Sequence, residues 1–353
     1  MKTASANKSA FDSVNVGFVS LIDAAPIIVA LELGYFVDEA IEVALHRQIG
    51  WGNVRDKLTF GHLDASHALL GMAPLSVLGK DMFGEPLVAI ASLGKGGNAI
   101  TLRRRLIDIG ITSPAALQRH IQRRDGKPLV FAHVFSCSTH HYLLRDWLSS
   151  AGIRPDKDIH LCALPPSQMV RQLGKGLLDG FCVGEPWGVV AESQGVGGII
   201  AATTELSPNH PEKVLAVSRK WLGRHSDIAE RLVRAVLRGC AFCNDGRNNA
   251  ELCKILSALR YLDKPPDLLA KSLALAVPGT TRRFRDWSAP QLAPDAANAA
   301  WLLRQMVRWG HLPADTKVAI VAEASVDPKP YLAASESLKS PRLVKEHIPI
   351  GVK

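Results

Sequence analysis

Four side chains able to take part in proton transfer, nucleophilic attack or metal binding lie close together in the sequence. They are His133, Cys137, His140 and His141, around the start of a predicted helix. The sequence shows no Ser-His-Asp arrangement, phosphate-binding loop or metal-spaced cluster, and we rank catalysis by this Cys/His group well below a binding role. We therefore predict no catalytic residues and no enzyme activity, and keep an enzyme on the same architecture as an alternative.

Cysteine spacing is the second chemical feature. Cys240 and Cys243 have the spacing of a redox motif or of half a zinc site, inside a segment with helical periodicity. A structural zinc site needs four ligands, and no second cysteine pair or histidine pair stands at ligand spacing. We predict no metal and no cofactor. The six cysteines show no disulfide-framework density, so a reducing compartment is expected.

Length, composition and charge limit the class of protein. The chain has 353 residues, of which 47% are hydrophobic and 21% charged, and its formal net charge is +9. Single hydrophobic cores stop growing near roughly 250–300 residues, so two lobes are expected. No apolar run approaches the roughly 20 residues that cross a bilayer, and we predict no membrane contact. The basic residues are mostly spread out, which favours a field that attracts a small anion over direct nucleic-acid binding.

The first residues bear on location. A bacterial signal peptide has a basic start, an apolar core of roughly 7–15 residues and a small-residue cleavage site. Met1 to Asp12 holds no such leader, and a buried strand is predicted directly afterwards at Val14–Val19. This pattern favours a cytoplasmic protein.

Strands and helices alternate in the first half of the chain. The strand at Val14–Val19 precedes a helix at Ile27–Leu33, which Asp23 is expected to cap and Gly34 to end. Further strands are predicted at Ile41–Leu45, Leu63–Ala68, Leu87–Ala91, Ala99–Leu102 and Pro128–Ala132. Further helices are predicted at Trp51–Phe60 and Thr139–Ser150. Such alternation is typical of α/β folds with parallel sheets covered by helices.

A turn repeats between the two halves of this pattern. Gly61–Ala65 and Leu177–Gly180 each join a helix to a short strand. The repeat predicts two lobes whose strands point towards a shared cleft, and ligands bind beyond the carboxyl ends of strands in such sheets. Beyond Trp221 the pattern is mostly helical, and we expect these helices to complete the first lobe. They are predicted at Ile228–Cys243, Asn249–Leu259, Pro266–Leu275 and Asp295–Trp309.

Five segments in a fixed order carry a family resemblance. They are Gly50–Leu58, Gly61–His67, Thr139–His140, Phe181–Trp187 and His210–Lys213. Together they resemble the nitrate/bicarbonate substrate-binding family of ABC transporters, over about Val14 to Tyr331. The resemblance implies an α/β, type II periplasmic-binding-protein fold with a ligand cleft between two lobes. Lobe 1 would comprise residues 13–102 and 215–337, lobe 2 residues 103–214, and the C-terminal tail residues 338–353.

The resemblance also implies nitrate-binding residues. They are Trp51 in the first lobe, Asn98, His140 in the second lobe, Gly184 through its backbone, and Lys213 as a cation. Nitrate is a planar monoanion with three acceptor oxygens, and all five residues offer N–H donors. Bicarbonate-binding members are expected to have a carboxylate in place of the lysine, so Lys213 favours nitrate or nitrite. We expect little competing negative charge around such an anion.

Each of these residues also has an ordinary structural explanation. A tryptophan at a helix start can close a core, a lysine after a Pro-Glu turn is usually solvated, and Gly96–Asn98 would form an ordinary turn. The chain departs from the family pattern too. Asn98 stands where transport members tend to have glutamine, Ser136–Ser138 replaces Pro-Gly-Gly, and His141 replaces an acid.

The missing leader directs the functional prediction. Within the family, such a chain resembles the NasS-type cytoplasmic nitrate sensors. This implies a NasT-like antiterminator protein as partner, an RNA-binding regulator of nitrate assimilation genes that is released when nitrate or nitrite binds. The first alternative is the substrate-binding component of a nitrate ABC transporter, and the second is an enzyme on the same fold.

Overall fold

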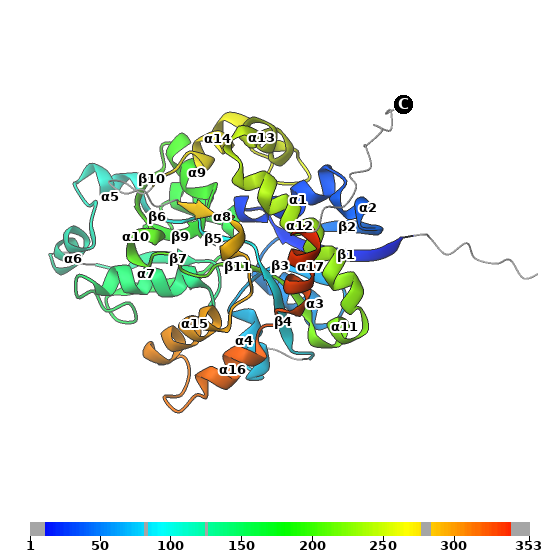
Figure 1. Cartoon of the computed structure of the whole chain (residues 1–353). Helices are drawn as coiled ribbons and strands as arrows, with labels where there is room; N and C mark the ends of the chain where they lie inside the picture. Colours follow the sequence, from blue (N-terminus) through cyan, green and yellow to red (C-terminus); the bar gives the residue numbers. More distant parts are fainter. Residues whose placement is uncertain (1–10, 81–83, 124–125, 277–283, 340–353) are drawn as a thin grey trace, which may run out of the picture.

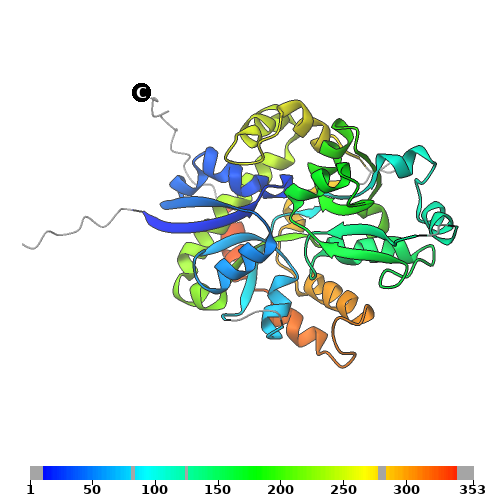
Figure 2. The same ribbon diagram turned by 180° about the vertical axis from the view of Figure 1, so that it is seen from behind.

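Two five-stranded sheets, each covered by helices, form two lobes that lie side by side (Figures 1 and 2). The computed structural model describes residues 11–80, 84–123, 126–276 and 284–339. The mixed α/β architecture confirms the predicted fold class. No helix in these four ranges is long and apolar enough to cross a bilayer.

The sheet of lobe 1 has the order β2-β1-β3-β11-β4. Its strands are β1 (Asp12–Val19), β2 (Ile41–Gln48), β3 (Ala65–Leu69), β4 (Leu87–Ser92) and β11 (Lys213–Ser218). Strands β1, β2 and β3 are parallel, and β11 runs antiparallel to both of its neighbours. The four strands predicted in this part of the chain are confirmed.

The sheet of lobe 2 has the order β10-β6-β9-β7-β8 and repeats this plan. Its strands are β6 (Asn98–Arg103), β7 (Leu129–His133), β8 (Ile159–Ala163), β9 (Gly180–Gly184) and β10 (Gly197–Ala202). Strands β7, β8 and β9 are parallel, and β6 runs antiparallel to β9 and β10. Each lobe therefore contains one antiparallel strand next to its third parallel strand.

The repeated turn has the same role in both lobes. The carboxylate of Asp64 accepts the Asn15 backbone N–H at 2.8 Å, and that of Asp179 accepts the Val130 backbone N–H at 2.9 Å. Each aspartate directly precedes the third parallel strand of its lobe and accepts a backbone N–H from the first. The predicted internal repeat is thus a structural one.

The chain changes sheets earlier than the predicted boundaries. Strand β6 begins at Asn98 and belongs to lobe 2, although residues up to 102 were expected in lobe 1. The return to lobe 1 comes before Lys213 rather than at residue 215. Strand β5 (Lys95–Gly96) lies at the first crossing, Lys95 forms a bridge with Pro211 at the second, and β12 (Arg285–Asp286) pairs with β5.

Helices cover both sheets, and their ends follow local sequence rules. Helix α1 (Ala25–Glu32) ends before Gly34, whose φ of 73° is the left-handed conformation that glycine adopts readily. Helix α7 (Thr139–Ser149) begins at Ser138, whose hydroxyl accepts the His141 N–H. The other helices are α2 (Tyr35–Asp38), α3 (Trp51–Thr59), α4 (Met72–Val77), α5 (Arg104–Asp108), α6 (Pro114–Gln122), α8 (Pro166–Gly174), α9 (Trp187–Ser193), α10 (Thr203–Leu206) and α11 (Arg219–Arg224).

The C-terminal helices connect the lobes rather than completing lobe 1 alone. They are α12 (Ser226–Asn244), α13 (Asn249–Ser257), α14 (Pro266–Leu273), α15 (Ala296–Arg308), α16 (Val318–Ala324) and α17 (Lys329–Lys339). Helix α12 packs on α1 and α17 of lobe 1, whereas α14 contacts α9 and α15 contacts α7 of lobe 2. Figure 2 shows α13 and α14 across the top of the junction and α15 and α16 across the bottom. Helix α17 includes residues 338 and 339, and the rest of the predicted tail lies outside the described residues.

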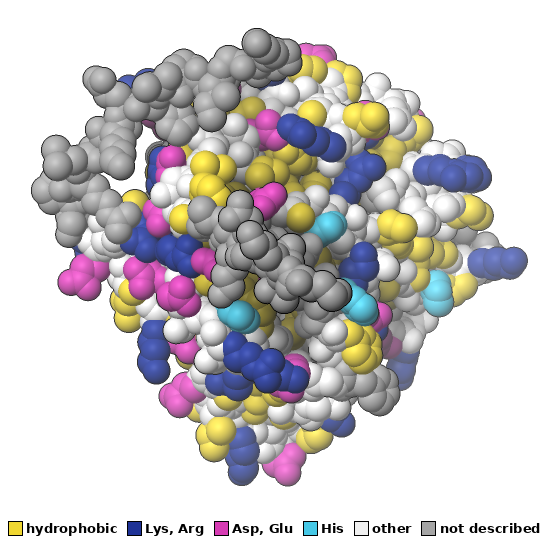
Figure 3. Space-filling view, turned by 90° about the vertical axis from the view of Figure 1, so that its right-hand side faces the viewer, with side chains coloured by type: hydrophobic (Ala, Val, Ile, Leu, Met, Phe, Trp, Pro, Cys, Tyr) yellow, Lys and Arg dark blue, Asp and Glu magenta, His cyan; other side chains and the backbone are white. Residues whose placement is uncertain are grey.

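Charged side chains are mixed on the surface. On the face of lobe 1 in Figure 3, lysines and arginines are interspersed with acidic and apolar side chains. This distribution matches the expected spread of basic residues along the chain.

Candidate functional site

The candidate site is a buried polar cluster between the two sheets, with Lys213 at its centre. The ammonium Nζ of Lys213 lies 2.8 Å from Asp23 Oδ2 and 2.7 Å from Glu212 Oε2, and the side chain is only 1% exposed. Burial alone would lower the pKa of Lys213, but the two carboxylates outweigh it and raise the pKa. Lys213 is therefore a charged ammonium inside the protein.

Lobe 1 supplies two more members of the cluster, His67 and Trp51. His67 Nδ1 accepts the Val19 backbone N–H, so its proton is on Nε2, which lies 2.9 Å from Asp23 Oδ1. The ring of Trp51 lies 5.2 Å from the His67 ring, and the Lys213 ammonium lies 5.6 Å from the Trp51 ring centre. The indole N–H of Trp51 is buried and has no hydrogen-bond partner within the described part of the chain.

Lobe 2 supplies His140 from the first turn of α7. Its side chain is fully buried, and neither ring nitrogen has a hydrogen-bond partner among the residues described. His140 Nε2 lies 3.9 Å from Glu212 Oε2, and burial lowers the pKa of His140 to about 3. The imidazole is therefore neutral at pH 7 and offers one N–H donor and one acceptor.

Asn98 and Gly184 face each other in adjacent strands of lobe 2. The Asn98 amide donates to Glu212 Oε1, while its Oδ1 is buried without a partner in the described ranges. A Cβ on Gly184 would lie 3.3 Å from this Oδ1 and 3.4 Å from Asp23 Oδ2. Glycine therefore leaves space beside the amide and the carboxylate. All five predicted site residues lie around one buried region, and their contacts with nitrate stay predictions.

Two acidic residues correct the expectation about charge. Little negative charge was expected, yet Asp23 and Glu212 both contact Lys213. Asp23 was predicted to cap α1, but that helix has no side-chain cap, and the carboxylate binds Lys213 and His67 instead. Burial would raise the pKa of Glu212, but the attraction of Lys213 outweighs it and lowers the pKa to about 2. Both carboxylates are ionised at pH 7.

His210 supports the cluster from the second crossing. Its Nε2 lies 2.8 Å from the Thr203 hydroxyl, and its Nδ1 lies 3.3 Å from Glu212 Oε1. Sequence reasoning quoted Glu212 and His210 within a motif without assigning them roles. Their position next to Lys213 in the sequence could have indicated that they lie at the site.

The histidine group near residue 137 divides in the structure. His140 joins the cluster, whereas the His133 and His141 rings stack at 3.9 Å with 14° between their planes. Arg145 donates to His141 at 2.8 Å and pairs with Asp156. No group of three or more His, Cys, Asp or Glu in the described ranges could hold a metal ion.

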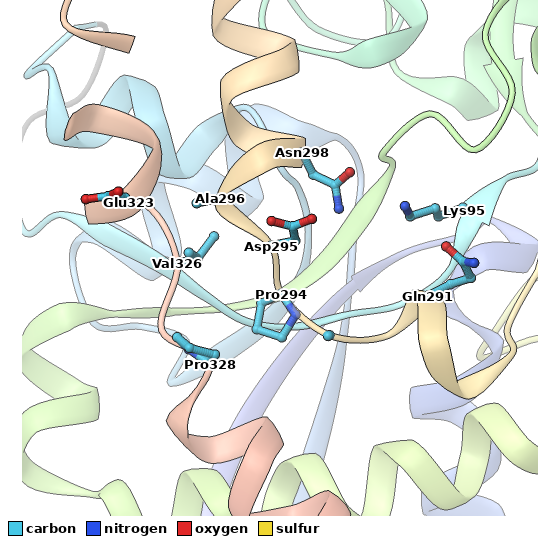
Figure 4. Close-up of a pocket in the computed structure, with 10 residues that line it drawn as sticks. Lys95, Gln291, Pro294, Asp295, Ala296, Asn298, Glu323, Val326 and Pro328 are labelled. Carbon is cyan, nitrogen blue, oxygen red and sulfur yellow. The ribbon is translucent and has the colours of Figure 1, made fainter. Parts of the chain in front are cut away.

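A separate hollow lies outside this cluster. It measures about 480 Å³ and is bordered by Lys95, Gln291, Asp295 and Asn298, as Figure 4 shows. Asp295 is exposed there and caps the start of α15, and Asn298 is half-buried. We place the candidate site at the Lys213 cluster because the buried polar groups without partners gather there.

Comparison with known proteins shows the family of the chain. Residues 7–257 match the NMT1-like family. The chain belongs to this family. It is 30% identical to the nitrate/nitrite binding protein NrtA of Nostoc sp., over 90% of this chain and 75% of NrtA. It is also 33% identical to the bicarbonate transport ATP-binding protein CmpC of Synechocystis sp., over 88% of this chain.

The match to a solved structure agrees. The crystal structure of the periplasmic nitrate-binding protein NrtA from Synechocystis PCC 6803 has a TM-score of 0.87 and 28% identity. The match covers 94% of this chain and 90% of that one. The predicted family resemblance and the periplasmic-binding-protein fold are therefore confirmed. The chain spans 48% of the length of CmpC.

Proposed function

We propose that this chain is a cytoplasmic receptor that binds nitrate or nitrite between its lobes and controls an RNA-binding antiterminator by ligand-dependent release. One observation carries the proposal. A buried, charged Lys213 lies among polar groups from both lobes, including N–H groups of Trp51 and His140 that have no partner among the described residues. Donors from two lobes suit a planar anion with three acceptor oxygens.

The two carboxylates need not exclude an anion. An ammonium has three N–H donors, and Asp23 and Glu212 take two of those on Lys213. The third remains for a ligand, as a charge-assisted hydrogen bond about twice as strong as a neutral one. We infer that Asp23 and Glu212 hold the ammonium in place when no ligand is bound.

Regulation of a partner follows from the two-lobed design. Lys213 and Trp51 belong to lobe 1, and His140 and Gly184 to lobe 2, so a ligand touching all four favours a closed arrangement. A ligand shifts such an equilibrium only by its differential affinity for the two forms. The open form would hold the NasT-like antiterminator and the closed form would release it. The free thiols of Cys162, Cys182, Cys240, Cys243 and Cys253 support a reducing compartment.

The partner can be tested by size-exclusion chromatography with light scattering. The chain is mixed with the antiterminator with and without millimolar nitrate. We expect a 1:1 complex that dissociates with nitrate, while chloride at equal ionic strength leaves it intact. A complex unchanged by nitrate would remove the sensor proposal and leave the anion site standing.

A transport receptor is the second candidate, because the similar proteins include components of nitrate and bicarbonate transport. It would bind the same anion and dock on membrane permease domains. Genomic sequence upstream of Met1 discriminates the two, since an in-frame apolar leader favours transport. Metal analysis combined with calorimetry tests the enzyme alternative: stoichiometric metal without heat from nitrate would favour catalysis.

A further inference from the structure

A second cation, the half-buried Arg285, lies beside the candidate site. Strand β12 pairs with β5 at the first crossing between the lobes, near the centre of the molecule in Figure 1. This pairing brings Arg285 over Gly97, where a Cβ would lie 2.8 Å from Nε and 3.2 Å from Nη2. Gly97 directly precedes Asn98, and its carbonyl accepts the Glu185 N–H at 3.2 Å. Arg285 therefore lies against the backbone next to Asn98 and Gly184, on the lobe 2 side of the cluster.

The guanidinium has donors that nothing described in the structure uses. Nε and Nη2 of Arg285 are both buried and have no hydrogen-bond partner in the described ranges. The guanidinium lies 5.7 Å from the Phe284 ring and 5.2 Å from the Trp287 ring. Buried arginines usually pair with a carboxylate or phosphate through two parallel hydrogen bonds. Within the described part of the chain, the Nε and Nη2 edge is open to such a pair.

Two carboxylates act on the guanidinium electrostatically, but neither accepts a hydrogen bond from Nε or Nη2 in the described ranges. Burial lowers the pKa of Arg285, while Asp23 and Glu185 raise it, so these acids are its electrostatic neighbours. Neither forms an ion pair with Arg285 among the described residues. Glu185 Oε2 instead accepts the Val189 N–H, and its Oε1 is buried without a described partner. Leaving a charged donor pair buried and unpaired costs free energy, which a ligand would recover.

We propose that Arg285 is a second anion-binding residue of the cleft, which binds two oxygens of a planar oxyanion through Nε and Nη2. This inference rests on the proposed function and adds a selectivity device to it. Lys213 is a point charge that any small anion can approach. A guanidinium edge fits two oxygens held in one plane, so Arg285 selects planar oxyanions over spherical halides.

Charge balance supports a second cation. With neutral histidines, Asp23, Glu212 and Lys213 together carry one net negative charge, which opposes an incoming anion. Arg285 adds one positive charge, while Glu185, whose pKa burial raises to about 7, adds part of a negative charge at pH 7. Because β12 lies between α14 and α15, which both contact lobe 2, the same contact would join the C-terminal segment to the bound anion.

The test is isothermal titration of nitrate and chloride into wild-type protein, Arg285→Gln and Arg285→Lys. Arg247→Gln is the control of equal charge change, since the Arg247 side chain is 90% exposed. Arg285→Gln is expected to weaken nitrate binding about 10-fold to 100-fold. Arg285→Lys is expected to bind chloride nearly as well as wild type while losing nitrate selectivity. A purely structural role would lower the melting temperature and leave the ratio of nitrate to chloride affinity unchanged.

The outcomes separate the two proposals. Wild-type protein that binds nitrate, with Arg285→Gln keeping wild-type affinity and selectivity, overturns the role of Arg285 alone. Wild-type protein that binds no nitrate overturns the proposed function together with this inference. If Arg285→Gln does not fold, the selectivity ratio of Arg285→Lys decides, and an unchanged ratio contradicts the inference.

Discussion

Replacing Lys213 with methionine removes the cation and keeps the approximate shape of the side chain. Two carboxylates, 2.7 and 2.8 Å from the ammonium, then stay buried without it. At an effective dielectric constant of ~20, each pair attracts by about 6 kcal/mol, and desolvation of the ions offsets much of this. Removing one partner of a buried ion pair typically costs about 3–5 kcal/mol. We expect Lys213→Met to lower the free energy of unfolding at pH 7.5 by about this amount.

Urea unfolding of wild type, Lys213→Met and the exposed control Lys220→Met is the assay, repeated at pH 5. Without Lys213, the pKa values of Asp23 and Glu212 rise, so protonation relieves the uncompensated charge at low pH. The deficit of Lys213→Met should therefore shrink at pH 5, while Lys220→Met stays within about 0.5 kcal/mol of wild type. A small deficit that is equal at both pH values would refute the ion-pair argument, because lost packing does not depend on pH.

Three further predictions concern buried groups. Burial raises the pKa of Glu185 from 4.5 to about 7, so its stabilising effect is present below pH 4.5 and lost as the pH rises through 7; Glu185→Gln should stabilise the fold by about 3 kcal/mol at pH 8.5 and by little at pH 4 in denaturant titrations. Burial lowers the pKa of His133 to about 4 and of His140 to about 3, so stability present above pH 6.5 is lost as the pH falls. Each histidine should lower the free energy of unfolding by about 2 kcal/mol at pH 5 relative to neutral pH. A glutamine variant that loses as much stability on acidification as the wild type would contradict this. Gly184→Ala places a methyl 3.3 Å from Asn98 Oδ1, and overpacking of about 1–3 kcal/mol in the liganded form should weaken nitrate binding about 10-fold or more by calorimetry; unchanged affinity would show that the anion lies elsewhere.

The sequence predicted the strands well where local pattern decides them. Alternating apolar residues indicated β1 and β2. Gly34 indicated the end of α1, because glycine adopts the positive φ of that position without steric strain. The repeated aspartate turns predicted two similar lobes. These features depend on residues close together in the chain.

Long-range partners were the limit of sequence reasoning. Asp23 has the residue type of a helix cap, and only the fold shows that Lys213 takes its carboxylate. The apolar pattern of Ala99–Leu102 suits a buried strand of either sheet, so it could not show that β6 pairs with β9 of lobe 2. Arg285 received no role, because its position depends on the pairing of β12 with β5.

The most direct test of the central claim is calorimetric titration of the purified chain with nitrate, nitrite, bicarbonate and sulfate at pH 7. The account predicts one site per chain for nitrate or nitrite, no saturable heat from sulfate, and loss of the nitrate heat in both Trp51→Ala and Lys213→Met. Absence of saturable nitrate heat, or full nitrate affinity in both variants, would contradict an anion site built around Lys213.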